Sequence, residues 1–334
     1  MDFGLTDEQD QLAAAERAWL ERHDPIARVR AALDSAAITI DPAAASHAGE
    51  SGLLELLTPE MGGSHVDLAV IAEAHGYAAS SLPIADLAVA TSLLEGADLA
   101  SANEGLTAVA FAPNGVSSPV PMAADLDAVA VIRRDGPKEY VSVVKTPALS
   151  TLSTLDLTRS WARLKLDAVV GDWTELPSGT AALVRDALAV HRAFDALGAA
   201  ARLLEMTVSY AGQREQFGAP IGSFQAVKHH CADMVLAVEA SRASLWAAAL
   251  ALDDNTGAAY LPVASLAQAR SRAASAAAAY AKSAAARVAG TALQVHGGIG
   301  FTWEHDLHLF LRRIKVDEAF DGTVAEHRAA LVTA

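Results

Sequence analysis

Apolar and polar positions divide the chain into three regions. From Thr6 to about Leu99 the apolar residues recur at helical spacing, which predicts amphipathic helices. Between about Gly105 and Gly179 short alternating runs such as TAVAFA, DAVAVIRR and EYVSVVK predict strands, and helical spacing then returns. We therefore expect a mainly α protein with a small middle β domain. The predicted domains are residues 1–104, 105–179 and 180–334.

The third region has the pattern of long helices joined by short turns. Helical spacing predicts helices over Leu183–Gln213, Phe224–Asp254 and Pro262–Val295. Long helices with short connections pack antiparallel, so a four-helix bundle is the expected architecture. Alanine on the facing sides lets the helices approach closely but leaves each of them little area to bury, so such a bundle would gain from an oligomeric partner. At the other end of the chain, Thr6 is the expected cap of the first helix.

Composition supports the helical interpretation and limits the partners. Hydrophobic residues make up 52% of the 334 residues but aromatic residues only 5%, and alanine and leucine are strong helix formers. The formal charge of -15 would repel nucleic acid and anionic membranes, so neither is an expected partner. A phosphate-bearing ligand would need locally placed arginines.

The single cysteine and the N-terminal residues indicate where in the cell the protein is expected. The single cysteine, Cys231, excludes an internal disulfide and a zinc site built on several thiolates. The start of the chain has neither a basic segment nor a long apolar one, and no uncharged apolar run of about 18 residues is present. We expect a cytoplasmic protein that does not enter a membrane.

Residues 210–234, YAGQREQFGAPIGSFQAVKHHCADM, form the most particular motif of the chain. They resemble the acyl-CoA dehydrogenase signature, in which a helix ends at Arg-x-Gln-Phe-Gly and the next begins at Pro-Ile-x-x-Phe-Gln. MDFGLTDEQDQL, TPEMGG, TLDLTRSWARLKLD, QVHGGIGF and FDGT resemble further family segments, in the family's order. The resemblance thus covers nearly the whole chain.

This resemblance implies a fold and an activity. The family fold is an N-terminal helical domain, a β barrel and a C-terminal four-helix bundle. The implied reaction is FAD-dependent removal of two hydrogens from an acyl-CoA, in which a base takes the α proton and the flavin takes the β hydride. An electron-transfer acceptor would then reoxidise the flavin.

The resemblance also implies FAD contacts that reach across a dimer interface to a neighbour's cofactor. Arg214 could bind a pyrophosphate through its fork of donors, although an isolated arginine at a helix end is more often a solvated side chain. Glycines at 297 and 298 would let backbone approach a phosphate, and a helix expected from about Thr302 would point N–H groups at this hinge. The implied FAD-contacting residues are Arg214, Phe217, Gln225, Gln294, His296, Gly297, Gly298 and Thr323.

Two histidine clusters raise the question of a metal. The cluster His229, His230, Cys231 and Asp233 lies on adjacent helical positions, which project about 100° apart and cannot converge on one ion. His305 and His308 are better spaced, but a polar helix face explains them more simply. No glycine-flanked nucleophile motif supports a Ser-His-Asp triad. We expect no metal site.

The chain departs from the family pattern in two places. The Thr-Glu-Pro-x-Ala-Gly-Ser and Trp-Ile-Thr/Ser stretches that line the flavin ring are missing from the middle region, where AFAPNGVSSP is the nearest segment. The usual glutamate base before Gly-Thr is replaced by Asp321, whose side chain is one methylene shorter, and Asp321 could equally be a turn residue that caps a helix. The alternative family position for the base falls near Leu188, and Asp186 would lie on another helix face.

These matches and departures lead to one main hypothesis. The chain would be the partner subunit of a heteromeric acyl-CoA dehydrogenase, an assembly of two chains of each kind (α2β2), whose other, homologous chain supplies the flavin-ring contacts and the base. Split enzymes of this type resemble those that act on steroid CoA thioesters. Two alternatives stay open: a self-sufficient homo-oligomer with Asp321 as catalytic base, and a non-catalytic scaffold subunit that has lost FAD.

Overall fold

The computed structural model describes residues 4–23, 25–35, 38–102, 105–113, 115–145, 148–166, 172–253 and 265–333. The N-terminal region is helical, as its apolar spacing predicts. Thr6 caps the first helix as expected, because its hydroxyl accepts a hydrogen bond from the Gln9 amide and its own amide donates to the Gln9 side chain. The helices are α1 (Asp7–His23), α2 (Pro25–Ser35), α3 (Pro42–Glu50), α4 (His65–Ala78) and α5 (Ile84–Gly96).

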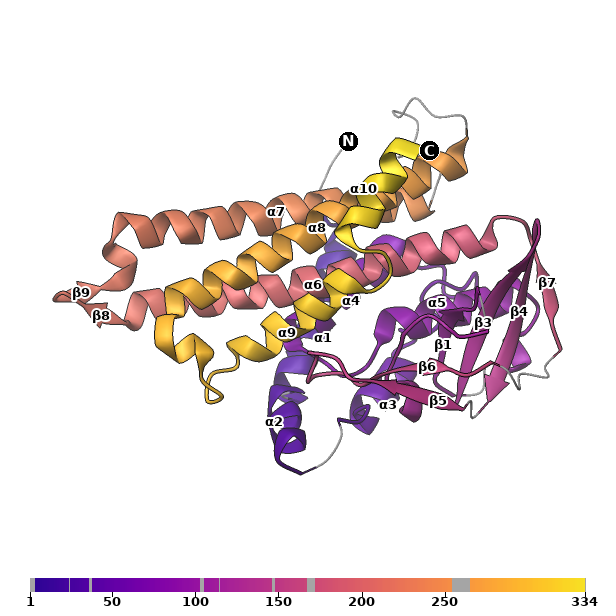
Figure 1. Ribbon diagram of the computed structural model, residues 1–334, viewed down its shortest axis with the longest axis horizontal. Helices are drawn as coiled ribbons and strands as arrows, with labels where there is room; N and C mark the ends of the chain where they lie inside the picture. The colour runs from indigo at the N-terminus through magenta and orange to yellow at the C-terminus, as the bar shows by residue number, and fades with distance from the viewer. Residues whose placement is uncertain are drawn as a thin grey trace.

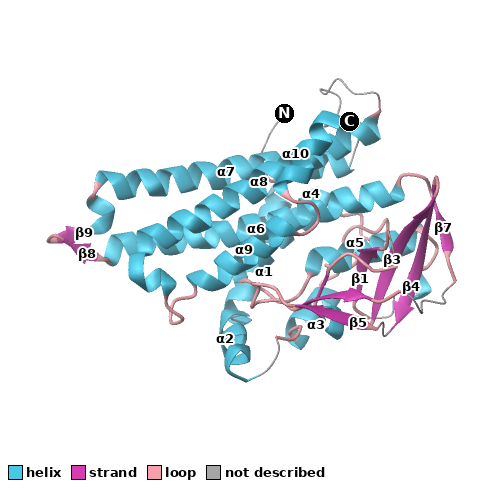
Figure 2. Cartoon of the chain, in the orientation of Figure 1, coloured by secondary structure: helices cyan, strands magenta, loops and turns pink. Residues whose placement is uncertain are grey.

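Two small sheets form the middle region, and Figure 2 shows their strands gathered at one end of the molecule. The larger sheet has the order β1 (Thr107–Phe111), β3 (Ala128–Asp135), β4 (Lys138–Lys145) and β7 (Thr174–Leu176). Strand β1 pairs parallel with β3, and the other pairs are antiparallel. The smaller sheet has the order β2 (Val120–Pro121), β6 (Trp161–Leu164) and β5 (Leu149–Leu152). Sequence alternation predicted β1, β3 and β4, but the other strands are too short to show a period.

The C-terminal region is built of long helices that run side by side (Figure 1). They are α6 (Thr180–Gln213), α7 (Gln225–Asp253) and α8 (Leu266–His296), followed by α9 (Leu307–Ala319) and α10 (Val324–Thr333). The three long helices match the predicted ones closely, although the predicted ends at Asp254 and Pro262 lie outside the described residues. The predicted fold class, mainly α with a small β region, is confirmed.

The helix expected from about Thr302 is a wrong prediction, since α9 begins only at Leu307. Residues Gly297–Phe301 form a short 3-10 helix, and Thr302 is extended with ψ of 154°. Glycines at 297, 298 and 300 make α-helical backbone entropically costly, so the chain turns tightly instead. No α-helix N-terminus therefore lies directly behind the glycine hinge.

Two glycines let α4 and α6 cross at close range. Gly76 of α4 lies against the backbone of Asp195, and Gly198 of α6 lies against the backbone of Glu73. A Cβ atom on Gly198 would stand 2.0 Å from the Glu73 carbonyl oxygen, so only glycine fits there. This crossing joins the N-terminal helices to the bundle without an intervening layer of side chains.

The element types change close to the predicted domain boundaries. Strand β1 begins at Thr107, after the short 3-10 helix Ala100–Ala102, and α6 begins at Thr180, shortly after β7 ends at Leu176. Buried side chains nevertheless continue across these points, because α5 packs on β1 and α6 packs on α4. The division into three separate domains stays a prediction.

Helix α7 carries three large apolar side chains among its exposed residues. Among the helices in the described ranges it alone is long and apolar enough to cross a membrane, a test that core helices of soluble proteins also pass, and 39% of its most apolar stretch is buried. Its outward residues Val235, Leu236 and Leu250 are exposed. Large exposed apolar faces on a folded chain commonly mark contacts with another molecule.

Candidate functional site

A short hairpin connects α6 to α7 at one end of the bundle (Figure 1). Strand β8 (Glu215–Gln216) pairs antiparallel with β9 (Ala219–Pro220), and Phe217 and Gly218 form the turn between them. Both turn residues have positive φ, +56° and +78°, as a tight two-residue hairpin turn requires. The REQFGAP segment is therefore an ordered projection.

Phe217 occupies the tip of this hairpin, and the residue is 95% exposed. Its only ring neighbour among the described residues is Phe224, which it meets edge-on at a centroid distance of 6.2 Å. Burying a phenylalanine side chain is worth about 1.5 to 3 kcal/mol, and Phe217 forgoes that gain in the isolated chain. Its ring is therefore open to contact with another molecule.

Arg214 and Gln225 flank the hairpin. The Arg214 amide donates to the Tyr210 carbonyl, and its carbonyl accepts a hydrogen bond from the Ile221 amide. Arg214 is exposed, and its guanidinium makes no hydrogen bond or ion pair with another described residue. The Gln225 amide lies 3.2 Å from a His229 ring nitrogen on an exposed face. Both side chains thus offer donors at the surface, as an anionic ligand requires.

The end of α8 lies against the end of α6. The His296 ring stacks on Tyr210 at a centroid distance of 4.5 Å and meets His305 edge-on at 4.7 Å. Its Nδ1 lies 2.7 Å from the Ala292 carbonyl and so carries the hydrogen, while the buried Nε2 has no partner among the described residues. Burial lowers the pKa of His296, so the ring is neutral at pH 7. It joins the two helix ends beneath the surface.

The glycine hinge beyond His296 is open to approach. Gln294, Gly297 and Gly298 are exposed, and Gly297 has a φ of +61°. A Cβ atom on Gly297 or Gly298 would meet nothing within 4 Å. Together with the hairpin, these residues form one surface that we call the hairpin end, defined by Arg214, Phe217, Gln225, Gln294, Gly297 and Gly298.

Thr323 and Asp321 lie elsewhere, in the turn between α9 and α10 (Figure 1). The Thr323 amide donates to the Glu326 carboxylate at 2.7 Å, and its hydroxyl accepts from the Glu326 amide at 3.2 Å. This is a capping box for α10, so the Thr323 hydroxyl already has a structural partner. The structure does not bring Thr323 to the hairpin end.

Asp321 is held by an ion pair. Buried Arg192 donates to the carboxylates of both Asp86 and Asp321. Buried Lys282 donates from its Nζ to the carbonyls of Phe320 at 2.7 Å and Gly322 at 2.9 Å, which fixes the same turn. One Asp321 carboxylate oxygen is thus bonded to a guanidinium, whereas a base must be free to receive a proton.

A cavity of about 510 Å³ lies between this turn and the β domain. Leu188, the alternative family position for a base, contributes an apolar wall. Asp186 also lines the cavity, but its carboxylate accepts hydrogen bonds from Arg270 at 3.1 Å and Ser271 at 2.6 Å. Burial raises the pKa of Asp186. Among the described residues that line the cavity there is no tryptophan, and Trp161 of the β domain is instead buried against Phe320.

A second group of buried charges ties the β domain to the bundle, and the sequence did not predict it. Arg159 contacts Asp156, Asp195 and Asp317 at 2.8, 3.4 and 2.7 Å. Arg313 forms a two-pronged pair with Asp195, with N–O distances of 2.8 and 2.5 Å. In the sequence these residues look like charges on helix and loop surfaces, and no spacing rule reveals that they converge.

The carboxylates of Asp195 and Asp317 take different protonation states. Burial opposes charge on Asp195, but Arg313 and Arg159 outweigh it and lower its pKa to about 2. Burial raises the pKa of Asp317 to about 7, and the neighbouring charge of Asp195 adds to the rise despite Arg159. Asp317 therefore holds a proton over much of the range below pH 7.

Replacing Asp317 by asparagine is expected to change the pH dependence of stability. A carboxyl with a raised folded-state pKa contributes stability that is full below its unfolded pKa and is lost as pH rises through its folded pKa, here between about 4 and 7. An asparagine at this position cannot ionise, so the variant does not lose this stability as the pH rises. Relative to the wild type, D317N should gain on the order of 1 to 3 kcal/mol in unfolding free energy from pH 4.5 to pH 8.

Urea unfolding at the two pH values measures this gain, and exposed Asp98→Asn is the matched control, for which no such gain is expected. A D317N gain no larger than that of D98N would show that Asp317 is ionised throughout.

His305 and His308 have aromatic neighbours. His305 packs on His296, and His308 meets Trp303 edge-on at 4.8 Å. Within the part of the chain that the structure describes, no group of three or more His, Cys, Asp or Glu side chains could hold a metal ion.

The hairpin end and the Asp321 turn differ in how they suit the expected flavin. Exposed donors without partners, an exposed aromatic ring and an open glycine hinge suit the phosphate-bearing half of FAD. The Asp321 turn is closed by Arg192 and Lys282, and the ring-lining segments of the family are missing beside it. The chain therefore fits part of the cofactor.

Comparisons with known proteins bear on the family of this chain. The family described as acyl-CoA dehydrogenase, C-terminal domain, matches residues 182–333. Acyl-CoA dehydrogenase IpdE2 of Mycolicibacterium smegmatis is 32% identical over 314 residues, which cover 92% of this chain and 93% of that protein. A chain in the ChsE4-ChsE5 complex from Mycobacterium tuberculosis is similar with a TM-score of 0.82, at 23% identity, over 100% of this chain and 98% of that one. A chain of the Tcur3481-Tcur3483 steroid ACAD is similar with a TM-score of 0.80, at 22% identity. The match covers 98% of this chain and 97% of that one.

Proposed function

Because this chain belongs to the acyl-CoA dehydrogenase family, whose members are FAD-dependent flavoproteins, we propose that it is one subunit of a heteromeric acyl-CoA dehydrogenase. Its hairpin end contributes to an FAD site whose ring is held by a homologous partner chain. The partner also supplies the catalytic base. The assembly is an α2β2 heterotetramer with one FAD for each unlike pair.

The exposed hairpin end is the observation that carries this proposal. The 95% exposed phenylalanine of this turn forgoes the gain from burial in an isolated chain, and with the solvated arginine beside it the turn is suited to a site completed by another molecule. In the proposed site the Arg214 guanidinium binds the pyrophosphate through two N–H groups, and Gln225 donates beside it. Phe217 packs on the cofactor, and the glycine hinge lets backbone amides approach.

The reaction chemistry lies outside this chain in the proposal. When bound, FAD accepts the hydride that leaves the β carbon of an acyl-CoA. Asp321 does not take the α proton, because its carboxylate serves the ion pair with Arg192 that fixes the turn. This chain acts by binding and orienting the cofactor. The groups that would do so are the unpaired ones of the hairpin end.

Two further observations support a partner chain. The similar solved structures include the ChsE4-ChsE5 complex and the steroid ACAD whose name joins two chains. Such a partner would bury the exposed apolar residues Val235, Leu236 and Leu250 of α7. We extend the proposal to a steroid-derived CoA thioester as substrate, an electron-transfer acceptor and a cytoplasmic location.

The cavity beside Asp321 favours one alternative, a self-sufficient enzyme that uses Asp321 as base. Replacing Asp321 by asparagine separates the two, because asparagine keeps an oxygen for Arg192 and tolerates the positive φ of +56° at this position. We expect D321N in the co-expressed complex to keep kcat/KM within about tenfold of the wild type.

Steady-state dehydrogenation of an acyl-CoA measures this ratio, and the flavin content of the same sample shows that the complex is intact. A loss of roughly a thousandfold with full flavin content would place the base in this chain.

A further inference from the structure

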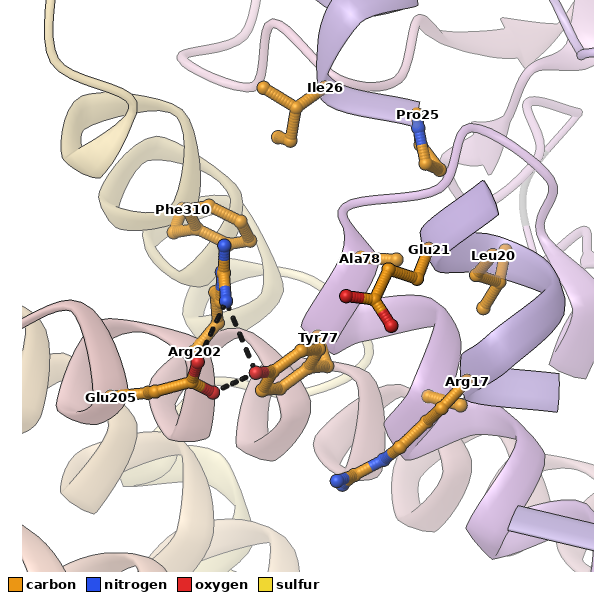
Figure 3. A pocket seen from close by; sticks show the side chains of 11 residues that line it. Arg17, Leu20, Glu21, Pro25, Ile26, Tyr77, Ala78, Arg202, Glu205 and Phe310 are labelled. Atoms are coloured by element: carbon orange, nitrogen blue, oxygen red, sulfur yellow. Dashed lines mark hydrogen bonds and ion pairs between the residues drawn. The ribbon is translucent and has the colours of Figure 1, made fainter. Parts of the chain in front are cut away.

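A second pocket, separate from the hairpin end, lies where α1, α2, α4, α6 and α9 meet (Figure 3). Its volume is about 270 Å³. Leu20, Ala74 and Phe310 form a buried apolar floor, each 1% exposed, and Ile26 of α2 faces them. The proposed function does not use this pocket.

One side of the pocket presents a hydrogen-bond donor. Tyr77 donates from its hydroxyl to Glu205, and Arg202 donates from Nη1 to the Tyr77 hydroxyl at 3.2 Å and to Glu205 at 3.1 Å. The Glu205 charge is therefore matched by Arg202. The other terminal nitrogen of Arg202 bonds to no described residue, and Figure 3 shows it directed along the Phe310 ring.

The opposite side presents a carboxylate. Glu21 of α1 makes no hydrogen bond or ion pair with any other residue that the structure describes, and Figure 3 shows its carboxylate directed toward Tyr77 and Ala78. Arg17, the other cation of the pocket, lies over the Tyr77 ring at 4.9 Å and pairs with Glu73 at 3.5 Å. Glu21 is thus the one acid of the pocket without a cationic partner among the described residues.

The pocket offers an apolar floor, a donor on Arg202 and an unpaired carboxylate on Glu21, and these three features indicate the chemistry of a ligand. We propose that this pocket binds a free α-amino acid with an apolar side chain. The ligand carboxylate accepts a hydrogen bond from Arg202, its ammonium donates to Glu21, and its side chain lies on Leu20 and Phe310. The cavity has the volume of about nine waters at ~30 Å³ each, which suits leucine and is too small for FAD or an acyl-CoA.

Binding there would act on the loop behind the glycine hinge. Helix α2, which carries Ile26, also carries Arg30, and Arg30 pairs with Asp306 at 2.5 Å in the segment just before α9. A ligand that bridges α1 and α2 to α6 and α9 would restrain this segment. The pocket is then an effector site that stabilises the fold, independent of whether a partner chain binds FAD.

Thermal unfolding and calorimetric titration of the full chain with L-leucine test the proposal. We expect saturable binding and a raised Tm, with about tenfold or greater weakening for 4-methylpentanoate, which lacks the ammonium, and for 3-methylbutylamine, which lacks the carboxylate. Glu21→Gln should weaken leucine about tenfold but leave 4-methylpentanoate unchanged. Glu8→Gln, on the exposed face of the same helix, is the control and should bind leucine like the wild type.

Ala74→Leu fills the pocket floor without changing charge and should abolish binding. If that variant does not fold, the Glu21→Gln result alone decides. The proposal is overturned if leucine does not bind at about 10 mM, if both analogues bind as tightly as leucine, or if Glu21→Gln leaves leucine binding unchanged.

Discussion

Replacing Gly198 by alanine should destabilise the protein by about 3 kcal/mol or more, because the new Cβ would overlap backbone atoms of α4. It would stand 2.0 Å from the Glu73 carbonyl oxygen and 2.6 Å from the Tyr77 amide nitrogen, and both are backbone atoms of α4. The clash can be relieved only if α4 and α6 move apart. Urea unfolding followed by circular dichroism gives the change in unfolding free energy.

Gly290→Ala is the matched control for this prediction. Gly290 also lies inside a long helix, α8, but a Cβ there meets nothing within 4 Å. Alanine is the better helix former by up to about 1 kcal/mol, so this variant should be as stable as the wild type or more stable. If G198A and G290A unfolded at the same urea concentration, the close crossing of α4 and α6 would be wrong.

Replacing Arg214 by alanine should weaken FAD binding by the co-expressed complex about ten- to a hundredfold, because a charge-assisted hydrogen bond contributes about 1.5 to 3 kcal/mol. Arg214→Lys should restore part of the affinity, since an ammonium keeps the charge but loses the two-pronged geometry. Flavin absorbance after dialysis, followed by titration with FAD, measures the loss.

Arg22→Ala serves as the control, because Arg22 is exposed on α1 in the N-terminal region and should not affect FAD. An R214A complex that keeps its flavin as tightly as R22A would remove the cofactor-lending role of the hairpin end. It would favour a scaffold subunit that has lost FAD contact.

The sequence predicted the parts of the fold that depend on local periodicity. The long helices α6, α7 and α8 and strands β1, β3 and β4 follow from apolar spacing. The cap at Thr6 also follows, because its partner Gln9 is only three residues away. Local rules suffice where neighbours in sequence are also the partners in space.

Features that depend on distant partners escaped sequence reasoning. Arg159 meets Asp195 and Asp317 across large sequence separations, and nothing in the pattern distinguishes these buried charges from surface ones. The contact of Gly198 with Glu73 could not be predicted either, because the two residues are far apart in the sequence. The start of α9 was misplaced because a run of polar and aromatic residues after the hinge fits either a helix or a loop.

The candidate site also has features that the sequence predicted and features that only the structure shows. The motif around Arg214 predicted a special turn, and the structure adds that Phe217 is almost fully exposed and that the Arg214 guanidinium has no partner in the described chain. Sequence reasoning could offer Asp321 as a base or as a turn residue. The structure shows the Arg192 ion pair that favours the turn role, a contact 129 positions away in sequence.

The number of flavins per chain decides whether the FAD site is shared between two unlike subunits. The chain purified alone and the complex with its homologous partner are each quantified for protein and for released FAD. If the proposed split site is right, the isolated chain will be colourless and the complex will contain one FAD for each unlike pair. An isolated chain that carries one flavin per polypeptide, reducible by an acyl-CoA, would contradict it.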